Sequence, residues 1–245
     1  MKHKWEKDKI FETGNNGSVD FKFDDKVANV FEDMLHRSIP GYSNIISMIG
    51  MFTKLHAKPN TNLYDLGTSL GAAALVMTKN STGKNCKIIA IDNSQPMINK
   101  CKKYLATEIN NGIVNLICED ILQTTITDAS VVVLNFTLQF IPLEQREKLI
   151  KNIYEGLVKD GILILSEKIK FENSITNQTQ IDYYHNFKRF TGYSELEISR
   201  KRDALENVLI PETKTTHFNR LYNAGFESIN QWFQYFNFAS FIAKK

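Results

Sequence analysis

The chain has 245 residues, a length that suits one large α/β domain with additions. Its 42% hydrophobic and 23% charged residues exclude extensive disorder, and a net charge of +3 is too small to indicate a nucleic-acid-binding surface. No apolar run reaches the roughly 18 residues of a membrane span, and the first residues lack the apolar stretch of a signal peptide. Cys86, Cys101 and Cys118 lack metal-ligand spacing. We therefore expect a cytoplasmic protein with reduced thiols, no metal site, and no direct contact with nucleic acid or membrane.

The amino-terminal part predicts a tail and two helices. Residues 1–22 are polar and contain glycine, so we expect a flexible tail. Apolar residues recur at helical spacing over 27–35, and two aspartates just before this stretch can cap the helix. The segment 38–42 breaks that helix, and a second one follows with apolar residues over 45–55.

Five buried strands alternate with helices in the next part of the chain. We expect them at 62–66, 86–92, 114–118, 130–136 and 161–166. Strands that alternate with helices predict right-handed crossovers and a doubly wound sheet.

The last third of the chain departs from this alternation. Residues 167–210 are typical of a charged helical insertion, a helix over 211–224 should end at Gly225, and the aromatic-rich stretch 228–243 should form two antiparallel strands at the sheet edge. We therefore predict a single Rossmann-like α/β domain over 23–245. Its sheet is mostly parallel and seven-stranded, with an antiparallel C-terminal edge strand and an N-terminal helical cover.

The loop between the first strand and the next helix is the strongest local motif. It runs from Asp65 to Gly71, at the edge of the sheet where open α/β folds bind ligands. Gly67 lets the backbone approach a ligand, and Gly71 allows close packing at the helix start. The pattern G-x-x-x-G differs from the G-x-G-x-x-G of dinucleotide sites. By itself it fits an ordinary tight turn equally well.

Polar residues end the next three strands. Asp92 can accept two hydrogen bonds from a ribose, although a carboxylate there could instead cap the following helix. Asp120 can reach an adenine amino group, and Asn135 lines the same crevice. Three polar strand ends at one crevice predict an adenosyl ligand without phosphates.

Several longer stretches carry a resemblance to a known family. They are RSIPGYSNII (37–46), YDLGTSLGA (64–72), IIAIDNS (88–94), VLNFTLQF (133–140), GYSELEIS (192–199), KR (201–202) and LENV (205–208). In these the chain resembles the carboxy-S-adenosyl-L-methionine synthase family of the class I methyltransferase superfamily. The likeness covers residue 23 to the C-terminus and includes segments outside the generic fold. The family loop usually has cysteine where this chain has Thr68, and we expect the change to be tolerated because the loop contact is made through backbone.

The resemblance implies a set of ligand contacts. They come from Tyr42, Gly67, Thr68, Ser69, Asp92, Asn93, Asp120, Ile121, Asn135 and Arg202. Tyr42 fits equally well as an aromatic residue in a helix-breaking turn. Arg202 has the greatest consequence, because the family's product carries a carboxylate on the former methyl carbon and an arginine fork can bind a carboxylate through two hydrogen bonds.

The reaction implied by the resemblance converts S-adenosyl-L-methionine and prephenate into carboxy-S-adenosyl-L-methionine and phenylpyruvate. Prephenate loses carbon dioxide, which the deprotonated S-methyl carbon captures, so water must be excluded. The N-terminal helices and residues 167–210 would serve as covers. No general base is assigned: His185 fits a structural role better, and substrate-assisted deprotonation is equally open. Cations for the prephenate dianion remain unranked among Arg37, Lys188, Arg189 and Arg200.

The resemblance also implies partners. The product would pass to a carboxymethyltransferase that modifies the wobble uridine of tRNA to 5-oxyacetyl uridine, and the chain would form a homodimer, with the helical insertion available as an interface. Two other functions stay open. One is a conventional S-adenosyl-L-methionine-dependent methyltransferase of a small molecule or RNA, and the other is a non-catalytic binding module that keeps the fold.

Overall fold

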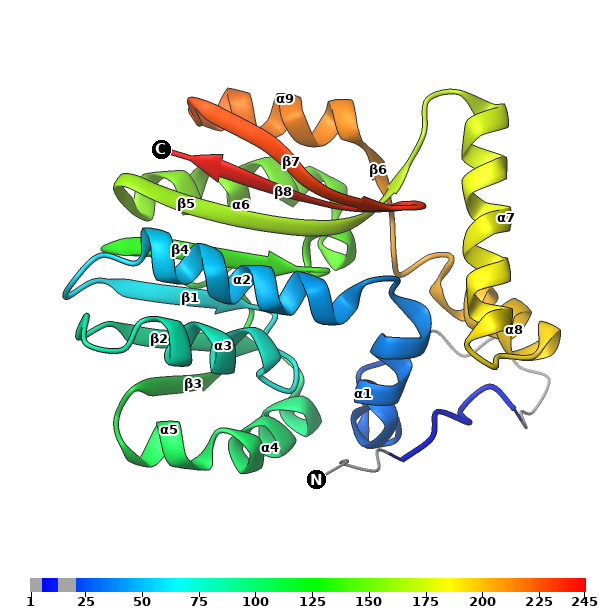
Figure 1. Ribbon diagram of the computed structural model, residues 1–245, viewed down its shortest axis with the longest axis horizontal. Helices are drawn as coiled ribbons and strands as arrows, with labels where there is room; N and C mark the ends of the chain where they lie inside the picture. Colours follow the sequence, from blue (N-terminus) through cyan, green and yellow to red (C-terminus); the bar gives the residue numbers. More distant parts are fainter. Residues whose placement is uncertain (1–5, 13–20) are drawn as a thin grey trace.

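The computed structural model describes residues 6–12 and 21–245 and contains one mixed sheet with helices on both faces (Figure 1). The strand order is β3-β2-β1-β4-β5-β8-β7, and the short β6 pairs with β5. The strands are β1 (Asn62–Leu66), β2 (Lys87–Asp92), β3 (Val114–Cys118), β4 (Ala129–Asn135), β5 (Leu157–Lys170), β6 (Glu212–Thr213), β7 (Ser228–Tyr235) and β8 (Phe238–Lys244).

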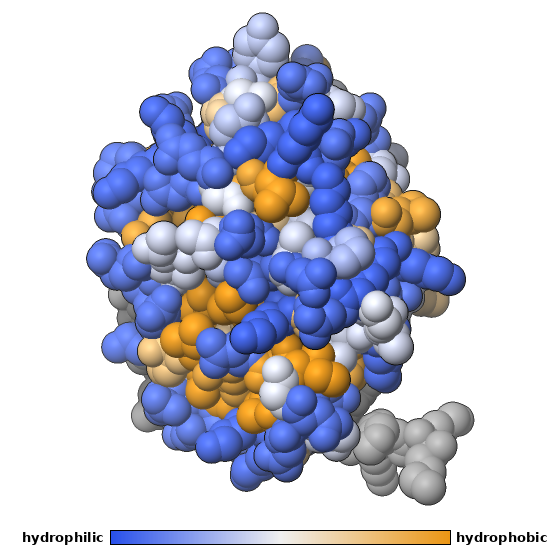
Figure 2. All heavy atoms as spheres, turned by 90° about the vertical axis from the view of Figure 1, so that its left-hand side faces the viewer, coloured by the Kyte–Doolittle hydropathy of each residue, from blue (hydrophilic) through white to orange (hydrophobic). Residues whose placement is uncertain are grey.

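The helices cover the sheet and its carboxyl edge. They are α1 (Asp25–Ser38), α2 (Tyr42–His56), α3 (Ala72–Asn80), α4 (Gln95–Tyr104), α5 (Ala106–Asn110), the 3-10 turn η1 (Leu138–Phe140), α6 (Leu143–Gly156), α7 (Ser174–Phe190), α8 (Glu195–Leu205) and α9 (Lys214–Ala224). Figure 1 shows α1, α7 and α8 grouped beyond the carboxyl ends of β1 and β4, whereas the amino ends of these strands lie on the other side. The face at the amino ends is mostly hydrophilic, with apolar side chains gathered in its lower half (Figure 2).

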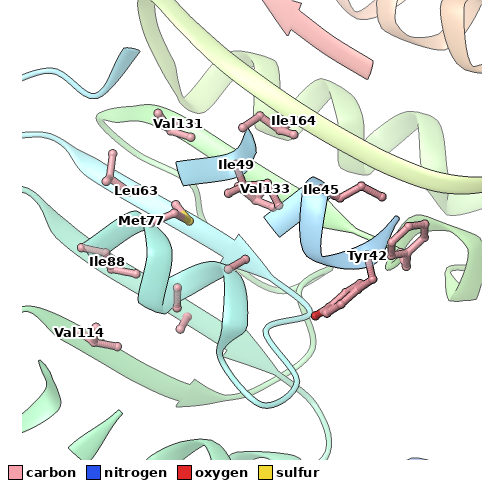
Figure 3. Close-up of a cluster of buried hydrophobic side chains, with 14 of the residues drawn as sticks. Tyr42, Ile45, Ile49, Leu63, Met77, Ile88, Val114, Val131, Val133 and Ile164 are labelled. Atoms are coloured by element: carbon pink, nitrogen blue, oxygen red, sulfur yellow. The ribbon is translucent and has the colours of Figure 1, made fainter. Parts of the chain in front are cut away.

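Period-two alternation divides the buried side chains between the two faces of the sheet. On β4, Val131 and Val133 pack with residues of α2 and α3, whereas Val132 and Leu134 pack with residues of α6 and α9. All four are fully buried, as a parallel strand covered on both sides requires. Figure 3 shows the first of these two clusters, in which Ile45 of α2 lies over the sheet.

The predicted α/β fold is confirmed, and the predicted helix starts are confirmed where a polar cap sits in sequence. Asp24 accepts a hydrogen bond from Val27 N at 3.0 Å, and Ser94 accepts one from Met97 N at 3.3 Å. Gly225 ends α9 with φ +112°, the left-handed conformation expected there.

Three details differ from the sequence prediction. The fifth strand extends to Lys170, because the C-terminal strand β8 pairs with it antiparallel as far as Lys168 and β6 pairs with its last residues. The sheet therefore has eight strands where seven were expected, and the helix expected from residue 211 begins at Lys214, because Thr213 caps it and belongs to β6. The expected antiparallel C-terminal pair is present, but its second strand, β8, lies next to β5, so β7 forms the edge of the sheet.

Part of the flexible tail expected over residues 1–22 lies outside the described ranges. Within the described segment 6–12, Asp8 is 1% exposed and accepts a hydrogen bond from Tyr193 Oη at 2.5 Å. Its carboxylate also lies 3.6 Å from Lys201 Nζ. This segment is therefore packed against α8 and the loop before it.

Candidate active site

A cavity of about 1430 Å³ opens at the carboxyl edge of the sheet. Its wall is formed by the segments that follow β1, β2, β3 and β4, together with parts of α1, α2, α7 and α8. It is lined by nine of the ten predicted ligand residues: Tyr42, Gly67, Thr68, Ser69, Asp92, Asn93, Asp120, Ile121 and Asn135. The fold therefore brings these nine into one space.

The loop after β1 is organised by a buried carboxylate. Asp65 is 1% exposed and accepts hydrogen bonds from Thr68 Oγ1 at 2.7 Å and from Ala74 N at 3.0 Å. Burial raises the pKa of Asp65 to about 6, while these hydrogen bonds oppose the rise. We expected Thr68 to act through its backbone. The structure adds a role for its hydroxyl, which holds the loop by its hydrogen bond to Asp65. Gly67 has φ +82°, and a Cβ atom there would lie 2.3 Å from Thr137 Oγ1.

The Asp92 carboxylate connects the glycine loop to the start of the following helix, which is one of the two roles that the sequence left open. Its Oδ1 accepts a hydrogen bond from Ser94 N at 2.9 Å, at the start of α4, and its Oδ2 accepts one from Ser69 N at 2.9 Å, in the glycine loop. Burial raises the pKa of Asp92, although the side chain reaches the cavity. Each carboxylate oxygen keeps a second lone pair, so the ribose contact remains available.

The end of β4 offers an acceptor that the protein leaves unsatisfied. The side-chain oxygen Oδ1 of Asn135 is buried and has no hydrogen-bond partner within the described ranges of the chain. Because buried polar atoms are normally paired, a donor from a bound ligand would complete this site. Asp120 and Ile121 line the same cavity. The Asp120 side chain also accepts a hydrogen bond from Leu122 N at 2.9 Å. These residues fit an adenosyl ligand.

Tyr42 begins α2 beside the loop that follows β1 (Figure 3). The ring is 9% exposed and meets the His36 ring edge-on, with 5.4 Å between ring centroids. Burial raises the pKa of the phenol, and the nearby Asp65 and Glu32 raise it further, so the hydroxyl stays protonated and able to donate a hydrogen bond.

Arg202 is the predicted site residue that does not line the cavity. Its side chain is 62% exposed, and Nη2 lies 3.1 Å from Oδ1 of the neighbouring Asp203. The residue before it, Lys201, is buried and lines the cavity instead. Successive residues of a helix point about 100° apart, so α8 can direct only one of these two cations inward.

Other cations and acids of the site were missed by the sequence analysis. Lys168, Lys201 and Tyr184 line the cavity, and the Tyr184 ring contacts both Lys168 and Phe238. Glu167 is fully buried and accepts hydrogen bonds from the backbone N–H groups of Leu138 and Gln139, both at 2.9 Å. The polar run at the end of the fifth strand could have indicated Lys168, by the argument already applied to Asp92.

The four cations that the sequence analysis considered for the prephenate dianion lie in different surroundings. Arg37 is buried, bonds to Asp33 and stacks on the Tyr193 ring at 3.8 Å. Arg189 is exposed and pairs with Glu195, and Arg200 binds backbone carbonyls of the segment 6–12. Lys188 is also buried and does not line the cavity, but its Nζ lies 4.7 Å from the ring centroid of Tyr184, which does. His185 does not line the cavity.

Two kinds of feature are absent from residues 6–12 and 21–245. No group of three or more His, Cys, Asp or Glu side chains there could hold a metal ion. None of the helices in that part of the chain is long and apolar enough to cross a membrane.

The fold and the cavity define a methyltransferase-type domain. A family model described as a methyltransferase domain matches residues 63–161. Among solved structures, an S-adenosyl-L-methionine-dependent methyltransferase from Methanococcus maripaludis gives a TM-score of 0.60 at 20% identity, covering 94% of this chain and 97% of that one. Human N-acetylserotonin methyltransferase gives a TM-score of 0.59 at 15% identity, covering 90% of this chain and 55% of that one. These structures share the fold.

Closer relatives specify the family. The carboxy-S-adenosyl-L-methionine synthase of Shewanella putrefaciens is 52% identical over 97% of this chain and 98% of its own length. The enzyme of the same name from Haemophilus ducreyi is 49% identical over 98% of both chains. This chain belongs to the carboxy-S-adenosyl-L-methionine synthase family.

Proposed function

We propose that this protein is a carboxy-S-adenosyl-L-methionine synthase, a transferase that converts S-adenosyl-L-methionine and prephenate into carboxy-S-adenosyl-L-methionine and phenylpyruvate. One observation carries the proposal beyond family membership. The cavity that holds the adenosyl-binding strand ends is also lined by two lysines, the half-buried Lys168 and the buried Lys201. Transfer of a methyl group alone has no need of such cations, whereas a carboxylated substrate and a carboxylated product do.

The roles of the chain's own residues follow from their positions. Asp92 and Asn135 hold the adenosyl part through the ribose and through a donor that satisfies Asn135 Oδ1. Bound S-adenosyl-L-methionine supplies a methyl group on a positively charged sulfur. The apolar side chains of α1 and α2 at the cavity wall keep water from the reacting carbon. No residue is assigned as general base.

Arg202 remains the proposed ligand of the product's carboxylate, now in a homodimer. Within one chain its guanidinium faces solvent on α8. The helices α7 and α8 expose large apolar side chains along their length: Ile175, Tyr183, Phe190 and Leu196. Exposed apolar groups of this kind favour an interface between subunits. If two copies pack through these helices, Arg202 of one can reach the site of the other.

The wider assignment rests on the family. We propose that the protein acts in the cytoplasm and passes its product to a carboxymethyltransferase, which uses it to modify the wobble uridine of tRNA. The net charge of +3 supports a role that needs no contact with the tRNA itself.

Mass spectrometry tests the reaction directly. Purified protein incubated with S-adenosyl-L-methionine and prephenate should form a product heavier than S-adenosyl-L-methionine by one carboxyl group, and none should form without prephenate. S-adenosyl-homocysteine as the only adenosyl product would instead point to a conventional methyltransferase. Failure to bind any adenosyl ligand in calorimetry would point to a non-catalytic module.

Two variants separate the binding of the carboxylate from the binding of the adenosyl part. Arg202→Leu should weaken the binding of the carboxylated product by about 2 to 5 kcal/mol, because it removes a charge-assisted pair. The binding of S-adenosyl-L-methionine should stay nearly unchanged. Asp92→Ala should weaken both ligands alike. An equal loss for both ligands in Arg202→Leu would remove Arg202 from the proposal.

A further inference from the structure

Two lysines beside Tyr184 have no carboxylate partner among the described residues. Lys168, at the end of β5, lines the cavity, whereas Lys188, on α7, does not itself line it. Neither forms a salt bridge with an acidic group in residues 6–12 or 21–245. Lys168 is half-buried and Lys188 is 4% exposed. Because an isolated buried charge costs several kcal/mol, an anion bound beside these lysines would stabilise their charged forms.

The ammonium groups of Lys168 and Lys188 both lie close to one aromatic ring. Lys168 Nζ lies 5.2 Å and Lys188 Nζ 4.7 Å from the centroid of the Tyr184 ring. Tyr184 and Lys188 are four residues apart on α7, so the helix presents them on one face. The two positive charges are thus held close together, next to a ring that itself lines the cavity.

The neighbouring charges leave this pair unneutralised. Lys201 is a further lysine nearby, but it lies 3.6 Å from Asp8 Oδ2. Glu167 precedes Lys168 on β5, so its side chain points to the opposite face of the sheet, where it binds backbone N–H groups. Lys168 and Lys188 are therefore the two lysines at this place that a bound anion can pair with.

Aromatic side chains complete the surroundings. The Tyr184 ring meets Phe238 edge-on with 5.0 Å between centroids, and Phe238 meets Phe136 in the same way at 5.9 Å. Phe136 follows Asn135 of the adenosyl site, so this wall connects the two halves of the cavity. We call the set Lys168, Tyr184, Lys188, Phe136 and Phe238 the lysine–aromatic corner.

We infer that the lysine–aromatic corner binds the second substrate, a dianionic carboxylic acid with an apolar ring, and places it beside the adenosyl ligand. The inference rests on the proposed function, under which this substrate is prephenate. Two carboxylates match the two unpaired ammonium groups, and the ring matches the wall of aromatic side chains. Lys168 lines the cavity and binds one carboxylate there, while Lys188 supplies the second charge beside Tyr184.

Calorimetry with a blocked reaction tests the corner apart from catalysis. Protein saturated with S-adenosyl-homocysteine has no methyl group to react, so titration with prephenate measures binding alone. Lys168→Met and Lys188→Met keep the side-chain volume and remove the charge, and each should weaken prephenate about ten- to a hundredfold. Affinity for S-adenosyl-homocysteine should stay unchanged, which also shows that the variant is folded.

Matched controls come from the same strand and from charge-preserving changes. Lys170→Met removes an exposed lysine two residues along β5 and should change prephenate affinity by no more than about twofold. Lys168→Arg and Lys188→Arg should recover part of the lost affinity, and they serve as the test should a methionine variant fail to fold.

The outcomes separate the corner from the proposed function. Unchanged prephenate affinity in Lys168→Met and Lys188→Met would overturn the corner, even if the wild type makes the carboxylated product. Weakened binding in these variants would support the corner, even if the wild type made no carboxylated product and the proposed function failed.

Discussion

At Gly67 the backbone and its surroundings both exclude a side chain. The φ angle is +82°, and a Cβ atom would lie 2.3 Å from Thr137 Oγ1 and 2.5 Å from its Cγ2. Gly67→Ala must therefore strain the backbone and displace Thr137, which lines the cavity. We expect S-adenosyl-L-methionine affinity to fall by about 1 to 3 kcal/mol in calorimetry, together with a lower melting temperature.

Gly83→Ala is a control that separates the effect of the steric clash from the effect of the backbone strain. Gly83 has φ +79°, close to that of Gly67, but nothing lies within 4 Å of the position of its added Cβ. The control should lose about 1 kcal/mol of stability and keep its ligand affinity. If both variants bound S-adenosyl-L-methionine as the wild type does, close approach at Gly67 would be irrelevant to binding.

Lys188 should make stability depend on pH. Burial, together with the facing charges of Lys201, Lys168 and Arg202, lowers its pKa from 10.5 to about 7. Below pH 7 the lysine is protonated in both states, and the folded state carries the full cost of the buried charge. Between pH 7 and 10.5 only the unfolded state keeps the proton, so the free energy of unfolding rises with pH.

Lys188→Met should therefore stabilise the protein most below pH 7, and the gain should shrink towards pH 10.5 by up to about 1.4 kcal/mol per pH unit. Urea unfolding at several pH values measures this difference. Lys170→Met, which removes an exposed lysine, should give a flat difference over the same range. A flat difference for Lys188→Met as well would contradict the lowered pKa.

At the scale of elements, the segment 6–12 and α8 are joined by a buried ion pair. Asp8 and Lys201 are 1% and 5% exposed, with 3.6 Å between Oδ2 and Nζ. Asp8→Ala leaves Lys201 buried without its partner, so we expect a loss of about 3 to 5 kcal/mol in urea unfolding. Glu12→Ala, whose pair with Lys9 is exposed, should change stability by less than about 1 kcal/mol. Equal effects would mean that the segment is not docked in solution.

The elements were predictable where local chemistry decides them. The five parallel strands could be located because buried strands with continuous apolar runs lie between turn residues. The start of α9 could not, because Thr213 ends β6 only through its pairing with the distant β5. Docking of Asp8 also escaped prediction, since a lone aspartate in a polar stretch gives no local sign of a partner 193 positions along the chain at Lys201.

At the scale of the whole molecule, α7 and α8 present the proposed subunit interface. Phe190 is 91% exposed, which is unusual for a phenylalanine. Phe190→Asp should convert a dimer into monomers in analytical ultracentrifugation, because it buries a charge in an apolar contact. Tyr222→Asp, at a 74% exposed position on α9, should leave the assembly unchanged. If the wild-type protein sedimented as a monomer, the result would contradict the proposed subunit interface.

The site was predictable to the extent that it depends on strand ends. Carboxyl ends of parallel strands meet at one edge, so Asp92, Asp120 and Asn135 could be grouped from sequence alone. The direction of a helix side chain is different, because it depends on how the helix packs. Lys201 and Arg202 are adjacent in sequence, and only the packing of α8 decides which of them enters the cavity.

The position of β8 has a consequence for synthesis of the chain. Residues 238–244 are synthesised after the other described strands, yet they pair between β5 and β7 and place Phe238 in the wall of the cavity. Until β8 has been made, β5 lacks this neighbour and β7 lacks its antiparallel partner. The adenosyl half of the cavity can therefore form before β8 is made, whereas the half beside Tyr184 is completed only when β8 joins the sheet.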